Sequence, residues 1–245
     1  MIKNIQVLVL LFLFCNMLAF AQEKSWFNLS AEYGYFTPGN DLKNKYGNNS
    51  TIGGSAIYKT SNNLLISFNG FYLFSDKVKN KNSILEIINN DKGDLIDGNG
   101  EIAEIRYFER GMGFYLKIGK IFPIWQINKN SGPTISIGPG FFQHKTRIDN
   151  PENLAPQIVG DYKKGYDRLS NGFSCNQFIG YTIFSDNRIF NCFFGIEFVQ
   201  AWTQNRRYDY NLMKKDNTKM FDTMWGVKAG WIIHFRRRVS GNIYI

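Results

Sequence analysis

Histidine is the first side chain to consider for chemistry in this sequence. His144, in "FFQHKTRID", and His234, in "WIIHF", are the only histidines among the 245 residues. A lipid-modifying site of the kind that uses His with Ser and an acidic partner requires all three in one constellation. "FFQHKTRID" has no His-x-Ser-Asn-like pattern, and the two histidines are expected at opposite ends of the fold. The sequence therefore predicts no catalytic residue.

Carboxylates and cysteines suggest no further site. Asp91, Asp94 and Asp97 lie in "DKGDLIDGNGE", which lacks the D-x-D-x-D-G spacing of a calcium loop. Glu104 and Glu109 occur in the charge-rich stretch "EIAEIRYFER" without a recognisable partner. There is no CxxC pair or Cys/His ligand cluster. We therefore expect no metal and no cofactor.

Five charged residues occupy alternate positions within otherwise apolar stretches. In "TMWGVKAGWIIHF", for example, Lys228 stands between Val227 and Ala229, and alternate side chains of a strand point to opposite faces. On a closed sheet these charges would point inward, where burial is costly unless they pair. We expect a paired network that fills the interior. A narrow ion or water path lined by the same charges is the alternative. The five residues are Glu32, Lys59, Lys117, Glu197 and Lys228.

The same alternation recurs eight times and predicts eight strands. The expected strands cover residues 26–36, 51–59, 64–74, 113–124, 133–145, 173–184, 189–202 and 223–235. The last spans roughly 33 Å, enough for a tilted strand to cross a membrane. Three connections are short, near residues 61–63, 128–132 and 185–187. Four are long and polar, near residues 38–50, 77–100, 148–170 and 204–220.

Short turns at one end and long loops at the other are typical of outer-membrane barrels. The predicted fold is all-β, an eight-stranded antiparallel up-and-down transmembrane β-barrel with short periplasmic turns and long extracellular loops. Its apolar face would meet lipid, with aromatic residues at the two interfaces. The expected lipid-facing aromatic belt comprises Phe27, Tyr35, Tyr72, Phe141, Trp202, Trp225, Trp231 and Phe235.

The N-terminus predicts export. Lys3 precedes an apolar run that ends in Ala19-Phe20-Ala21, the A-x-A pattern of a secretory signal peptide. We expect residues 1–21 to be the signal and residues 22–245 to be one barrel domain, with a short basic periplasmic tail at 236–245. The full chain has a net charge of +9, which becomes +8 when Lys3 is removed with the signal, and an exported chain of this charge is more suited to anionic lipid than to nucleic acid. The expected location is the outer membrane of a Gram-negative bacterium.

Two cysteines remain after residue 21. With a hairpin turn near Asp186-Asn187, Cys175 would face Phe198 and Cys192 would face Tyr181. The two sulfurs would then lie roughly 20 Å apart at the usual rise per residue, too far to bridge. Two free, apolar-facing thiols are expected.

Taken together, the A-x-A signal, the eight amphipathic strands, the three short turns, the four long loops and the late "WIIHF" resemble small outer-membrane barrels of the OmpA/OmpX/OmpW type. Phe235 resembles the terminal aromatic by which the barrel-assembly machinery recognises its clients. The chain departs from that pattern, because Arg236-Arg237-Arg238 and "VSGNIYI" follow the aromatic. This tail would either extend the last strand or present Tyr244-Ile245 as the recognition signal.

Two loops mix Tyr with Lys and Arg, the mixture expected either for cations paired with lipopolysaccharide phosphates or for a protein contact surface. The candidate contact residues are Tyr162, Lys163, Lys164, Tyr166, Arg168, Arg206, Arg207 and Tyr208. We expect a non-enzymatic barrel with a structural or docking role, one form of which is an accessory subunit of an outer-membrane complex. The alternatives are a small channel or hydrophobic-ligand conduit, and a lipid A-modifying enzyme. Expected partners are outer-membrane lipids, lipopolysaccharide, the assembly machinery and envelope proteins, without nucleic acid.

Overall fold

The architecture is that of a closed antiparallel β-barrel. A computed structural model describes residues 25–124, 129–151, 153–185 and 191–235. For residues 234 and 235 it describes the backbone alone. The predicted signal peptide and basic tail lie outside these residues. The barrel strands are β1 (Trp26–Gly39), β2 (Asn49–Lys59), β3 (Leu64–Ser75), β4 (Arg106–Ile121), β5 (Gly132–Asp149), β6 (Ser170–Ile183), β7 (Cys192–Asn205) and β10 (Lys219–Phe235).

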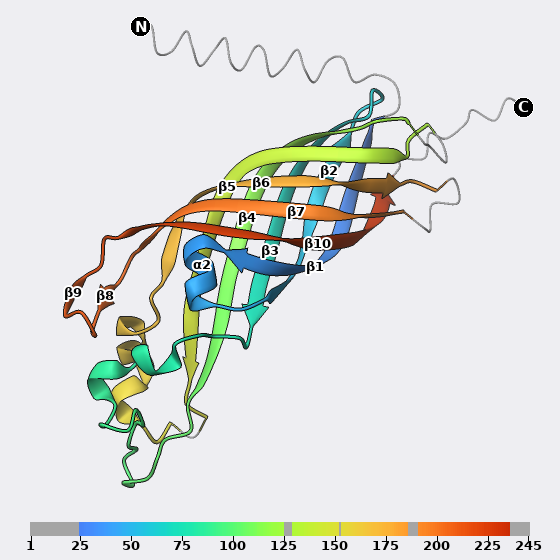
Figure 1. Ribbon diagram of the computed structural model, residues 1–245. Helices are drawn as coiled ribbons and strands as arrows, with labels where there is room; N and C mark the ends of the chain where they lie inside the picture. The colour runs from blue at the N-terminus through green and yellow to red at the C-terminus, as the bar shows by residue number, and fades with distance from the viewer. Residues whose placement is uncertain (1–24, 125–128, 152, 186–190, 236–245) are drawn as a thin grey trace, which may run out of the picture.

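Each strand pairs with its neighbours in sequence, and β1 pairs with β10 to close the cylinder (Figure 1). The predicted eight-stranded up-and-down barrel is thus confirmed. Burial follows the sequence alternation: in β1, exposed Tyr33 and Tyr35 alternate with buried Glu32, Gly34 and Phe36. Closure explains this pattern, because a cylinder has one enclosed face and one outer face and leaves no unpaired edge.

The register between β6 and β7 corrects one prediction. Cys175 faces Gln200 and Cys192 faces Ile183, a shift of two residues from the expected pairs. A two-residue shift keeps every side chain on its predicted face, because side chains alternate with a period of two. The expected centre of the turn, Asp186-Asn187, lies outside the described residues. Both cysteines are free, as predicted.

The long connections are folded rather than open. The first carries α2 (Asn40–Lys45). The second carries η1 (Lys81–Ser83) and η2 (Glu86–Ile88), and the third η3 (Pro156–Ile158) and η4 (Gly160–Gly165). The fourth carries the small hairpin β8 (Tyr208–Asp209) and β9 (Lys214–Lys215). Figure 1 shows these pieces gathered at the end where β4 and β5 extend beyond the barrel. Among the described residues, no helix is long and apolar enough to span a membrane.

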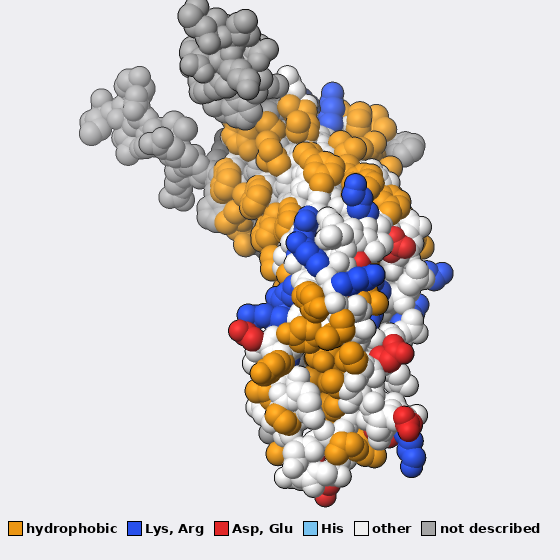
Figure 2. All heavy atoms as spheres, turned by 90° about the vertical axis from the view of Figure 1, so that its left-hand side faces the viewer, with side chains coloured by type: hydrophobic (Ala, Val, Ile, Leu, Met, Phe, Trp, Pro, Cys, Tyr) orange, Lys and Arg blue, Asp and Glu red, His pale blue; other side chains and the backbone are white. Residues whose placement is uncertain are grey.

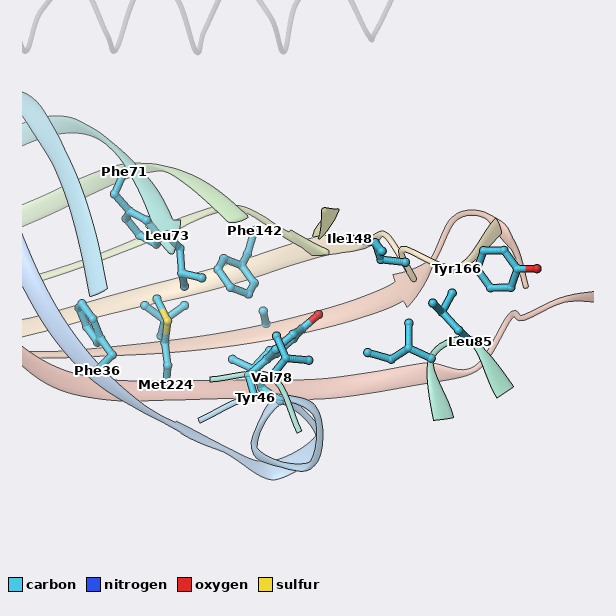
Figure 3. Close-up of a cluster of buried hydrophobic side chains, with 14 of the residues drawn as sticks. Phe36, Tyr46, Phe71, Leu73, Val78, Leu85, Phe142, Ile148, Tyr166 and Met224 are labelled. Carbon is cyan, nitrogen blue, oxygen red and sulfur yellow. The ribbon is translucent and has the colours of Figure 1, made fainter. Parts of the chain in front are cut away.

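The largest hydrophobic core joins the barrel interior to these loops. Inward-facing Phe36, Leu73 and Met224 contribute from the strands, whereas Tyr46 and Leu85 contribute from the loops. Figure 3 shows Tyr46 and Val78 beside the barrel side chains, with Leu85, Ile148 and Tyr166 farther out. The loops therefore close the outer half of the barrel with apolar side chains, an arrangement that strand periodicity does not predict.

Candidate functional site

An ion-paired layer crosses the middle of the barrel. Lys228 Nζ lies 2.7 Å from Glu32 Oε2 and 2.7 Å from Glu197 Oε2. Lys117 Nζ lies 3.8 Å from Glu197 Oε1. The four side chains come from β1, β4, β7 and β10, and all are buried. Two carboxylates and two ammonium groups balance in charge, and this pairing offsets the desolvation cost of burying them.

Uncharged polar side chains complete this layer. Ser30 Oγ donates to Glu32 Oε1 at 2.6 Å, and Asn69 Nδ2 donates to Glu32 Oε2 at 2.8 Å. Lys117 Nζ donates to Asn176 Oδ1 at 3.0 Å, and Asn176 in turn donates to Glu197. Sequence reasoning selected only the charges and missed both asparagines. Their inward positions in alternating stretches were the available signal.

Lys59 does not join the layer. Its Nζ lies 5.0 Å from the centre of the Trp26 ring and donates to Asn130 Oδ1 at 3.1 Å, near the short-turn end of the barrel. Placing it in the same network was wrong, because the inward direction of a side chain does not fix its height along the barrel. Lys59 is the last residue of β2, so it points inward at the rim.

A cavity of about 60 Å³ adjoins the ion layer on the short-turn side. Hydroxyls of Ser55, Ser67 and Thr134 line one part of it, and Phe178 and Phe193 line another. This volume suits a few water molecules. A small buried cluster of Ile121, Phe184 and Ile232 lies toward the same end.

An aromatic layer lies on the opposite, loop-facing side. Phe71 stacks on Tyr115 with ring centres 5.8 Å apart, and Phe71 and Phe142 are 6.5 Å apart. Ser174 Oγ donates to Tyr115 Oη at 3.1 Å. All three rings are almost fully buried. Ion layer and aromatic layer together fill the width of an eight-stranded barrel.

Beyond the aromatic layer, His144 has an acidic partner that sequence reasoning failed to find. His144 Nε2 lies 3.0 Å from Asp222 Oδ2, and Thr203 Oγ1 donates to the same oxygen. The pair joins β5 to β10, which are remote in sequence. The partner was missed because closure of the barrel, rather than local spacing, brings them together. Both side chains are fully enclosed.

A loop side chain covers this histidine. Tyr46, which follows α2, packs edge-on against His144 with ring centres 5.7 Å apart, and its hydroxyl lies 2.9 Å from Thr146 Oγ1. Burial raises the pKa of the Tyr46 hydroxyl. Glu109 lies nearby, where it accepts hydrogen bonds from Asn49 Nδ2. The His144–Asp222 pair is therefore buried, with the Tyr46 ring packed against His144.

The loop residues predicted as a contact surface divide into two groups. Tyr162, Lys164, Arg206 and Tyr208 are exposed. Tyr166 is buried, which corrects its assignment to a surface, because its ring packs edge-on against Tyr210 at 5.2 Å.

The remaining loop cations are partly buried. Arg207 pairs with Asp167, and Arg168 Nε lies 3.7 Å from Asp209 Oδ2. Lys163 is half-buried. These arginines hold the loops together as well as lining their surface.

The outer face of the barrel carries large apolar side chains. Of the predicted aromatic belt, seven members are exposed between 39% and 55%: Phe27, Tyr35, Tyr72, Phe141, Trp202, Trp225 and Trp231. The backbone of Phe235 pairs with that of Phe27. The side chain of Phe235 is not among those that the structure describes. Figure 2 shows hydrophobic side chains over the upper, barrel part of one face, with Lys and Arg side chains below them.

A closed sheet with an apolar exterior and a polar, filled interior would expose a large apolar surface to water, which soluble proteins avoid. It is the architecture of membrane-spanning barrels. The chain is an outer-membrane β-barrel protein. No family model matches it, and no curated protein matches it in sequence.

Among solved structures, the chain is similar to Ail, the attachment invasion locus protein of Yersinia pestis, described in complex with the heparin analogue sucrose octasulfate. That likeness has 11% identity and a TM-score of 0.41, and covers 85% of this chain and 99% of Ail. It is also similar to OprG of Pseudomonas aeruginosa, with 9% identity, a TM-score of 0.38, and coverage of 86% of this chain and 98% of OprG.

Proposed function

We propose that this protein is a non-enzymatic outer-membrane barrel whose folded extracellular loops dock a protein partner. One observation carries the proposal: the loops pack together around buried apolar side chains that continue the barrel core, while they present large side chains to solvent. Ligand-binding loops that move freely bury few apolar contacts. Here Leu85, Ile158 and Tyr166 are buried in the loops themselves.

Contacts between loops fix this packing. Tyr210 N donates to Gly165 O at 3.1 Å, and the Tyr210 ring lies where a Cβ of residue 165 would otherwise stand, so only glycine fits there. Asn211 Nδ2 donates to Ser83 O at 3.1 Å and to Ile84 O at 2.8 Å. The second, third and fourth long loops are therefore tied to one another.

The exposed side chains of these loops have the composition of a binding surface. Tyr162 and Met213 are each 64% exposed, and Ile87, Tyr208 and Leu212 are about half exposed. Figure 2 shows hydrophobic side chains grouped again in the lower, loop part of the molecule. Tyr and Arg are enriched in interface hot spots, and exposed apolar clusters mark contact sites. We call Ile87, Tyr162, Tyr208, Leu212 and Met213 the loop surface.

The enclosed His144–Asp222 pair supports the non-enzymatic part of the proposal. Catalysis requires contact between the reacting atoms and the acid, base or nucleophile. Both side chains have no exposed surface, and Tyr46 lies over them. Lipid A from cells with and without the gene should therefore have the same mass spectrum.

Crosslinking in intact cells followed by purification in mild detergent tests docking. Tyr208→Glu and Met213→Glu place charges within the loop surface and should abolish co-purification of a stoichiometric partner. Ile102→Glu is the control, because Ile102 is 66% exposed in the second loop but lies outside the defined surface. Docking would be contradicted if the wild type and all variants purified without a partner, or if Ile102→Glu lost the partner as completely as Tyr208→Glu and Met213→Glu. Heat-modifiable migration on gels shows that each variant is folded.

A hydrophobic-ligand conduit is the second candidate, favoured by the apolar lining of the outer half of the lumen. Phe36, Leu73 and Met224 face inward there. The loop side chains Leu42 and Tyr46 fill that space, so a conduit would require loop 40–48 to move. The related alternative is a narrow ion channel through the barrel. Planar-bilayer recordings without conductance, in the wild type and in Lys117→Gln and Lys228→Gln variants, would eliminate that channel.

A further inference from the structure

The outer face of β10 has a shallow depression in the middle of the apolar belt. Its floor is Val227 and Ala229, two of the smaller outward side chains on that strand. In the sheet register, Ala229 lies directly between Tyr33 of β1 and Phe194 of β7. Val227 likewise lies between Tyr35 and Ile196. Larger side chains therefore stand on both sides of a lower floor, which we call the outer trough.

Two adjoining hollows make up the outer trough, and they share Tyr33, Phe194 and Ala229. Trp231, 50% exposed, borders the hollow nearer the short-turn end. The two wall strands lie about 10 Å apart, twice the spacing of neighbouring strands. A hydrocarbon chain touching both walls needs roughly 7–8 Å between wall atoms. The floor between the walls is therefore about as wide as one acyl chain.

The tyrosine walls are fixed without any ligand. Tyr33 Oη lies 3.1 Å from Ser50 Oγ, and Tyr35 Oη accepts a hydrogen bond from Asn48 Nδ2 at 3.1 Å. Ser50 and Asn48 lie toward the loop end of the barrel, so both rings are tied to neighbouring polar groups there. A fixed groove loses little entropy on binding a flexible chain.

Three exposed cations lie beyond the outer trough, at the loop end of β1 and β10. Helix α2 continues directly from β1 and packs against β10, and its Lys43 is exposed. Lys79 Nζ donates to Lys43 O at 2.8 Å, which brings a second exposed cation to the same place. Lys219, also exposed, begins β10. Within the described part of the chain, none of the three forms an ion pair with a carboxylate.

We propose that the outer trough holds one acyl chain of lipid A, with a lipid A phosphate at Lys43, Lys79 and Lys219. The apolar trough lies within the hydrocarbon zone, and the three cations lie farther along β1 and β10 toward the outer surface, so the arrangement matches an outer-leaflet lipid with an anionic headgroup. This inference rests on the outer-membrane location and does not depend on a docked protein.

Native mass spectrometry of the full barrel, extracted from outer membranes in mild detergent, tests the site. The wild type should retain one lipid A molecule per barrel. Ala229→Phe fills the floor of the outer trough and should lower retention at least tenfold. Ile118→Phe is the matched control, because Ile118 is also an outward apolar residue, 59% exposed, on the distant strand β4. It should retain lipid A like the wild type.

A second experiment distinguishes the contribution of the lipid headgroup from that of the acyl chain. A variant with Lys43, Lys79 and Lys219 all changed to Gln should lose lipid A several-fold, yet bind added dilauroylphosphatidylcholine like the wild type. Retention of phospholipid instead of lipid A by the wild type would overturn the assignment. So would a lipid-free dimer that Ala229→Phe separates, or equal retention in Ala229→Phe and the wild type. Tyr208→Glu, which tests docking, should leave lipid retention unchanged, so the two proposals fail separately.

Discussion

Lys228 and Glu32 are separated by most of the chain, yet Lys228 Nζ lies 2.7 Å from Glu32 Oε2. They meet because β10 pairs with β1 when the barrel closes. Lys228 also lies 2.7 Å from Glu197 Oε2, so a single ammonium group bridges two buried carboxylates. The seam that closes the cylinder is thus held by charge as well as by backbone hydrogen bonds.

Replacing Lys228 by Met should destabilise the barrel by about 3–5 kcal/mol, because it leaves buried carboxylates without their cation. Urea unfolding in detergent micelles, followed by tryptophan fluorescence, measures the loss. Adding Glu197→Gln to the same variant should recover part of it. Lys120→Met is the control, since Lys120 is exposed at the end of β4. An unchanged midpoint for Lys228→Met would show that the layer contributes nothing to stability.

Tyr46→Phe should destabilise the loop end by about 1 kcal/mol, because Thr146 loses its hydrogen-bond partner in a buried site. Tyr46→Ala should cost more, because it also leaves a cavity beside His144. Limited proteolysis within residues 40–48 measures local opening. Tyr162→Phe, on the exposed surface, should cleave at the wild-type rate. Equal protection of Tyr46→Ala and wild type would contradict a role for Tyr46 in closing the lumen.

Removal of the aromatic layer should increase conductance. A Phe71→Ala, Phe142→Ala double variant opens space between the ion layer and the loops, so planar bilayers should show steps above the wild-type baseline. The matched control removes two stacked rings from the lipid face, Phe68 and Phe114, whose centres are 6.4 Å apart. Conductance in the wild type, or steps of equal size in the control, would show that these rings do not close the lumen.

Stability should depend on pH through Lys45 of α2. Burial lowers the pKa of Lys45 below its usual 10.5, although Asp222 acts in the opposite sense. Among the described residues, its Nζ donates to the Met220 thioether, a weak acceptor. The unfolded chain therefore binds this proton more tightly than the folded one. Stability from this group rises with pH between the lowered pKa and 10.5.

The measurement is the difference in unfolding free energy between the wild type and Lys45→Met across that pH range. Lys45→Met should be more stable than the wild type at neutral pH, and the gap should narrow as the pH rises. Exposed Lys43→Met should show neither effect. A gap that widens with pH would contradict the assigned direction.

The strands and the orientation of their side chains could be predicted from the sequence. Alternation with a period of two assigns Tyr33, Val227 and Trp231 to the outer face and Glu32 and Lys228 to the inner face, and it survives the register error between β6 and β7. The free cysteines follow from the same reasoning. Periodicity is a local property of the chain, which is why a single sequence carries it.

Contacts across the closed barrel could not be predicted in this way. Lys59 and Lys228 share the inward direction, but only the stagger of the strands places Lys228 in the ion layer and Lys59 at the rim. The pairing of His144 with Asp222 and the burial of Tyr166 were missed for a related reason. Each depends on segments that are distant in sequence and adjacent only after folding.

What the sequence by itself determined, then, is which side of each strand meets lipid, because that depends on residue type and a fixed two-residue repeat. Only the tertiary structure decided which charges meet and how the loops close the lumen. Closure of the cylinder sets the height of every side chain, and the loop core forms only when four separate segments pack together.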